Sequence, residues 1–160
     1  MECFSTLVVD DETDFLETLV KRLQRRNIET VGVTSGEQAL DTMAKMHFDA
    51  VVLDMKMPGG IDGIETLREI KRQHPLTEVI LLTGHGSVEA SIEGMKMGAF
   101  DYLLKPIKLE ELLVKLGEAF MKKDAQEQKI RNARIKELVR SPDRVFQQEN
   151  DEKSESEPKD

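Results

Sequence analysis

The chain has 160 residues, and its 39% hydrophobic content is sufficient for one globular domain of ordinary size with an extension. A formal net charge of -8 and a pI near 5.0 argue against general attraction to nucleic acid phosphates or anionic lipid. The single cysteine, Cys3, cannot form an internal disulfide, and no apolar run approaches the roughly 20 residues of a membrane span. We therefore expect a cytoplasmic protein with no membrane contact and no direct nucleic-acid partner.

Short runs rich in Val, Ile and Leu alternate along the chain with stretches of helical periodicity, which is typical of βαβ units and a parallel sheet. A helix is expected after each strand, with N-caps at Thr13 and Ser35 and a helix end at Gly98. The last helix carries an apolar stripe from Leu109 to Phe120. The predicted strands are Thr6 to Val9, Glu29 to Val33, Ala50 to Leu53, Val79 to Leu82 and Tyr102 to Leu104.

The composition changes after about Met121, where the apolar stripe thins to isolated residues among many charges. Residues 121–140 hold seven Lys or Arg against three Asp or Glu, and residues 141–160 hold seven acidic against three basic residues. We expect a folded domain over residues 1–121, a charged extension over residues 122–140 that can prolong the last helix, and an acidic, disordered tail over residues 141–160.

Polar residues stand where four of the predicted strands end. Asp10 and Asp11 follow the first strand, Asp54 the third, Thr83 the fourth and Lys105 the fifth. In an open parallel sheet, ligands bind outside the carboxyl ends of the strands. Any one of these residues could be a plain helix cap or turn residue, but their joint placement favours a site.

Three carboxylates in one crevice predict a cation. At an effective dielectric near 20, each close pair of carboxylates repels by about 4 kcal/mol unless a cation lies between them. The candidate ligands offer only oxygen, with no His or Cys at suitable spacing, so a hard ion such as Mg²⁺ is expected. Lys105 adds a positive charge for Asp54 or a phosphoryl oxygen, and Thr83 offers a hydroxyl donor.

The acidic pair, the stretch Asp54-Met55-Lys56-Met57-Pro58 and the later Lys105-Pro106 resemble the receiver domains of two-component response regulators. The resemblance spans about residues 6–120. It implies a flavodoxin-like α/β fold, with a doubly wound, five-stranded parallel sheet in the order 2-1-3-4-5 and a charged C-terminal extension. It also implies that Pro106 often follows a cis peptide.

The resemblance further implies a signalling protein that is not an enzyme beyond its own autophosphorylation and autodephosphorylation. Its partners would be a sensor histidine kinase or phosphotransfer protein, a downstream protein target and, on phosphorylation, a second copy of itself. The implied roles are Asp54 as phosphoacceptor, Asp10, Asp11, Asp54 and the Lys56 backbone carbonyl as Mg²⁺ ligands, Thr83 and Lys105 as reacting partners, and Thr83 and Tyr102 as switch residues.

In such domains the phosphoryl group draws the Thr83 hydroxyl toward Asp54, and Tyr102 turns inward. The face made by the fourth helix, fifth strand and last helix then rearranges to bind a partner. The alternative is a half-buried tyrosine that never moves. The resemblance also places Lys56 and His85 where phosphoryl hydrolysis is tuned, although a solvated loop residue is the favoured interpretation of His85.

The loop from Pro58 to Gly63 is one residue longer than the family's usual Pro-x-x-Asp-Gly, which predicts altered kinetics or partner contacts. An aspartyl-phosphate phosphatase of the haloacid dehalogenase type is the main alternative, but Lys56 stands where those enzymes carry a second Asp. A binding module that has lost phosphorylation fits poorly with the intact acceptor set. No DNA-binding or ATPase module follows, so we expect a stand-alone receiver or one cut from a longer regulator.

Overall fold

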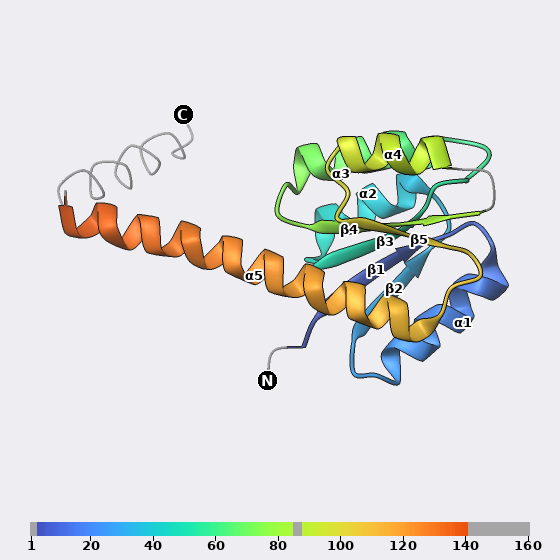
Figure 1. Cartoon of the computed structure of the whole chain (residues 1–160), viewed down its shortest axis with the longest axis horizontal. Coiled ribbons are helices and arrows are strands. Elements are labelled where there is room, and N and C mark those ends of the chain that lie inside the picture. The colour runs from blue at the N-terminus through green and yellow to red at the C-terminus, as the bar shows by residue number, and fades with distance from the viewer. Residues whose placement is uncertain (1–2, 85–87, 141–160) are drawn as a thin grey trace, which may run out of the picture. The chain divides into compact units, whose positions relative to one another are not determined.

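A computed structural model describes residues 3–84 and 88–140 and contains one five-stranded sheet (Figure 1). All neighbouring strands are parallel, and their order is β2-β1-β3-β4-β5. The strands are β1 (Ser5–Val9), β2 (Glu29–Val33), β3 (Ala50–Asp54), β4 (Glu78–Thr83) and β5 (Asp101–Leu104). The helices are α1 (Thr13–Gln24), α2 (Gly36–Lys45), α3 (Gly63–Gln73), α4 (Val88–Lys96) and α5 (Leu109–Arg140). The predicted fold class and strand order are confirmed.

Helices cover both faces of the sheet: α2, α3 and α4 lie on one face, and α1 and the beginning of α5 lie on the other (Figure 1). Every residue of β3 and β4 is buried, as expected for central parallel strands with helices on both faces. Two apolar clusters form the core, one on each side of the sheet. Because helices bury both faces of the sheet, polar side chains can gather only at the ends of the strands.

The helix starts show one confirmed and one wrong prediction. Ser35 caps α2, because its side chain accepts a hydrogen bond of 3.2 Å from the Gln38 amide. Thr13 does not cap α1 but is its first helical residue. Glu12 is the N-cap residue of α1, and its side chain makes no capping hydrogen bond. The Asp10 carboxylate accepts from the Glu12 amide at 2.9 Å in the turn before the helix. Gly98, with φ +103°, follows α4 as predicted.

The chain forms two compact units, residues 1–123 and 124–160. In the first unit, Lys123 is almost fully buried, and its Nζ lies 3.0 Å from Asp49 Oδ1 and 3.2 Å from His47 Nε2. The predicted end of the folded domain at residue 121 stays a prediction, and the predicted tail over residues 141–160 lies outside the described part of the chain. Within residues 3–84 and 88–140, no helix combines the length and apolar character needed to cross a bilayer.

Candidate functional site

Three aspartates meet at the carboxyl edge of the sheet. Asp10 follows β1 directly, and Asp54 is the last residue of β3. The strand β3 therefore ends one residue later than the predicted end at Leu53. Because β1 and β3 are neighbours, paired Val9 to Leu53, both acids leave the sheet at the same place. Carboxylate oxygens of Asp10, Asp11 and Asp54 all lie within 4.8 Å of one another. The structure thus brings together the acids that the sequence singled out.

The three acids differ in their exposure to solvent. The Asp10 side chain is fully buried and Asp54 is only 4% exposed, whereas Asp11 is more open to solvent. Asp10 uses one oxygen for the Glu12 amide and the other for Lys105. Of the three acids, Asp11 is therefore the one most accessible from solvent.

Lys105 supplies the positive charge of the site. Its Nζ lies 2.8 Å from Asp10 Oδ2, 3.7 Å from Asp54 Oδ2 and 4.6 Å from the centre of the Phe15 ring. Burial favours the neutral amine, but the hydrogen bond to Asp10 and the attraction of Asp54 outweigh it and raise the pKa of Lys105. The lysine is therefore charged at neutral pH. The peptide between Lys105 and Pro106 is cis.

Asp54 has a perturbed acidity. Burial, followed by repulsion from the Asp10 carboxylate, raises the pKa of Asp54 to about 6, against the opposing effects of Lys105 and of the Lys56 amide. That amide donates to Asp54 Oδ1 at 3.3 Å. Lys105 thus lies against two of the three clustered carboxylates, those of Asp10 and Asp54. Carboxylate oxygens are the ligands that hard divalent cations prefer.

Thr83 is the last residue of β4, next to β3, where Asp54 pairs with Leu82. Its side chain is 1% exposed, and among the described residues its Oγ1 has no hydrogen-bond partner. A buried hydroxyl without a partner is unfavourable by about 1–3 kcal/mol. Thr83 thus holds an unused donor beside the acids. His85 lies outside the described residues.

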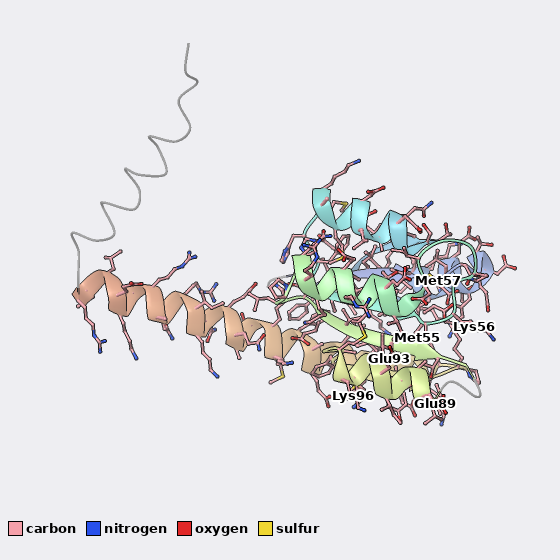
Figure 2. The ribbon with its side chains drawn as sticks, turned by 90° about the horizontal axis from the view of Figure 1, so that it is seen from above. Met55, Lys56, Met57, Glu89, Glu93 and Lys96 are labelled. Atoms are coloured by element: carbon pink, nitrogen blue, oxygen red, sulfur yellow. The ribbon has the colours of Figure 1, made fainter. Side chains whose placement is uncertain are left out.

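The loop from β3 to α3 begins with Met55, Lys56 and Met57, which Figure 2 labels. Gly59 has φ +78° and Gly60 has φ +133°, conformations that glycine adopts readily. The loop ends at α3, which the Asp62 side chain caps by accepting from the Glu65 amide at 2.8 Å.

An apolar groove lies between α4 and β5, and Tyr102 lines it with its side chain 43% exposed. The groove has a volume of about 400 Å³. Figure 2 shows Glu89, Glu93 and Lys96 along α4, and the last of these also lines the groove. The other lining residues are Val88, Ser91, Ile92, Met95 and Leu104. Tyr102 therefore faces an open apolar surface.

Comparison with known proteins identifies the family. Residues 6–117 match the family model of the response regulator receiver domain. The chain belongs to this family. The receiver assignment made from the strand-end residues is therefore confirmed, and the phosphatase alternative is not favoured.

Similar receivers occur in long regulators. The chain is 37% identical over 106 residues to the response regulator protein PilR of Pseudomonas aeruginosa, covering 66% of this chain and 24% of PilR. It is 39% identical over 106 residues to the regulatory protein AtoC of Escherichia coli, covering 66% and 23%. The DNA-binding transcriptional regulator NtrC of Klebsiella pneumoniae is 33% identical over 128 residues, covering 80% and 27%. The chain spans about a quarter of the length of these relatives. Because NtrC is named as a DNA-binding protein, this similarity conflicts with the expectation of no nucleic-acid partner.

Solved structures show the same fold. A response regulator receiver domain protein from Clostridium thermocellum is 35% identical, with a TM-score of 0.74 and coverage of 77% of this chain and 98% of that one. NtrX from Brucella abortus, in complex with ADP, is 30% identical, with a TM-score of 0.76 and coverage of 79% and 29%. The match extends over nearly the whole length of the Clostridium thermocellum protein.

Two contacts near the site were not predicted from the sequence. Phe15 is an apolar residue of α1, and Lys105 Nζ lies over its ring. Glu37, in the first turn of α2, accepts a hydrogen bond of 2.8 Å from the Ile61 amide in the loop after β3. An acidic residue in a first helical turn is common because it complements the helix dipole, so the sequence held no signal for this contact.

Proposed function

We propose that the receiver accepts a phosphoryl group on Asp54, with Mg²⁺ held by Asp10, Asp11, Asp54 and the backbone carbonyl of Lys56. The gathering of three carboxylates within 4.8 Å, with one lysine beside them, is the observation that carries this proposal. Mg²⁺ suits such a site because it binds through few carboxylates and keeps positions for water and phosphate oxygens.

The protein groups divide the reaction between them. A carboxylate oxygen of Asp54 attacks phosphorus, a bond forms between them, and the bond from phosphorus to the donor's histidine nitrogen breaks. With a pKa of about 6, Asp54 is mostly ionised above that pH and able to attack. Lys105, held by Asp10, offsets charge on the phosphoryl oxygens. Bound Mg²⁺ would supply the remaining neutralisation of those oxygens.

The phosphoryl donor is, on this proposal, a sensor histidine kinase or a phosphotransfer protein, and the output is a protein contact. Support for a switch comes from the Thr83 hydroxyl, which has no hydrogen-bond partner in the described part of the chain, and from half-exposed Tyr102 beside the α4–β5 groove. A phosphoryl group on Asp54 would give Thr83 its acceptor. The downstream partner, or a second copy of the receiver, would then bind at α4, β5 and α5.

We place the receiver in the cytoplasm and limit its chemistry to its own phosphorylation and dephosphorylation. The acidic net charge supports a protein target rather than nucleic acid for these residues. In a longer regulator such as NtrC, DNA binding would belong to residues outside the receiver.

Labelling with acetyl phosphate tests this function. In the presence of Mg²⁺ the wild-type protein should take up one phosphoryl group, and Asp54→Asn should take up none. Labelling that survives Asp54→Asn would reject the site. Continuous release of phosphate from many phosphomonoesters, at rates above those of ordinary receiver dephosphorylation, would instead support the phosphatase alternative.

A further inference from the structure

The loop between β3 and α3 is tied to a helix from another part of the chain. Glu37, in the first turn of α2, accepts the Ile61 amide at 2.8 Å through its Oε1. This hydrogen bond lowers the pKa of Glu37, so the accepting group is a carboxylate at neutral pH. The contact joins residues 24 positions apart, and it lies between the acceptor strand and α3.

Glycines let α2 and the loop approach closely on both sides of this hydrogen bond. A Cβ at Gly60 would lie 2.6 Å from Glu37 Oε1, and a Cβ at Gly36 would lie 2.8 Å from Cγ1 of Ile61. Real Cβ atoms do not approach other atoms so closely. The carboxylate of Glu37 therefore occupies space that exists because residue 60 has no side chain.

The ends of the loop are also fixed. The Lys56 amide donates to Asp54 at its beginning, and a Cβ at Gly63, where α3 begins, would lie 2.6 Å from Met55 Cα. Between these ends stand Gly59 and Gly60, both with positive φ. Adjacent glycines leave a chain segment many accessible conformations, so a contact from outside the loop has a large ordering effect.

We propose that Glu37 is a positioning residue for the metal site: it orders the β3–α3 loop and so keeps the Lys56 carbonyl at the edge where Asp10 and Asp54 lie. The inference rests on the proposed function, because it assigns the Lys56 carbonyl to the Mg²⁺ shell. Glu37 itself contacts neither the metal nor the phosphoryl group.

Isothermal titration with MgCl₂ tests the role of Glu37. Glu37→Ala should weaken Mg²⁺ binding about tenfold, the lower end of the range for outer-shell partners of metal ligands. Glu37→Gln keeps an oxygen acceptor for the Ile61 amide and should stay within about twofold of wild type. Asp41→Ala, which removes an exposed carboxylate further along α2, is the matched control for charge and should bind like wild type.

Amide hydrogen exchange of Ile61, followed by NMR, reports on the hydrogen bond between Glu37 and Ile61 in the absence of metal. The exchange should be faster in Glu37→Ala than in Glu37→Gln. Wild-type Mg²⁺ affinity in Glu37→Ala would overturn the inference, as would equal weakening in Glu37→Ala, Glu37→Gln and Asp41→Ala, because that pattern reports charge alone. Absence of Mg²⁺ binding by wild type would contradict the proposed function. The exchange of the Ile61 amide would then test by itself whether Glu37 orders the β3–α3 loop.

Discussion

Lys105 and Asp10, 95 residues apart in sequence, form an ion pair of 2.8 Å at the carboxyl edge of the sheet. The Asp10 side chain is fully buried, and its two oxygens accept hydrogen bonds from this lysine and from the Glu12 amide. The pair holds Lys105 beside Asp54, where on the proposed function it would meet the phosphoryl group.

Lys105→Met should destabilise the metal-free protein by about 3 kcal/mol at pH 7.5, because it leaves the buried Asp10 carboxylate without its ionic partner. Urea denaturation in EDTA measures the change. Lys108→Met, an exposed lysine just beyond Pro106, is the control and should change stability by less than about 0.5 kcal/mol. Equal stabilities of the two variants would show that the pair is not needed for the fold.

Asp54→Asn should stabilise the metal-free protein above pH 7. The pKa of Asp54 is raised from 3.8 to about 6 in the folded state, so the wild type loses stability as the pH rises through that range. Asparagine carries no charge and escapes this loss, which we put at about 1–3 kcal/mol. Below pH 4 both side chains are neutral, and the two proteins should be equally stable.

Denaturation in EDTA at pH 4 and pH 7.5 measures this difference, with Asp41→Asn as a surface control. A gain of the same size at both pH values would show that Asp54 is not held at a raised pKa. Saturating Mg²⁺ should reverse the order at pH 7.5, because the ion stabilises the wild-type site that the variant lacks.

Thr83→Val should leave the stability of the unphosphorylated receiver unchanged or raise it by up to about 1 kcal/mol. The hydroxyl is buried and has no hydrogen-bond partner among the described residues, so a methyl group of similar shape removes a desolvated polar atom. The same variant should fail to transmit activation. On addition of Mg²⁺ and beryllofluoride, the NMR signals of the Tyr102 ring should shift in wild type and stay in place in Thr83→Val.

A loss of about 2 kcal/mol in Thr83→Val would instead mean that the hydroxyl already has a partner in the resting protein. Tyr102 signals that respond alike in both proteins would remove Thr83 from the switch.

Most of the fold was predictable because each element has a strong local signal. The apolar run before Asp54 is typical of a buried parallel strand, and the polar residues at four strand ends locate the site. Contacts made by single side chains across the structure were not predictable. Glu37 holds the β3–α3 loop and Lys123 lies buried against Asp49, although both side chains look like ordinary charges on helices.

The predicted Thr13 cap was wrong by one residue. Glu12 takes the N-cap position of α1, and Thr13 already lies in the helix. The Asp10 carboxylate accepts from the Glu12 amide, so a side chain of the site contributes to the turn before α1.

An NMR titration with Mg²⁺ tests the central claim most directly, because it reads the site before any phosphoryl donor is involved. We predict saturable shifts confined to Asp10, Asp11, Asp54, Lys56 and their neighbours, with a single dissociation constant and strong weakening in Asp11→Asn. Spectra of these residues that do not change as Mg²⁺ is added would contradict the assignment of this edge of the sheet as a metal-dependent phosphoacceptor site.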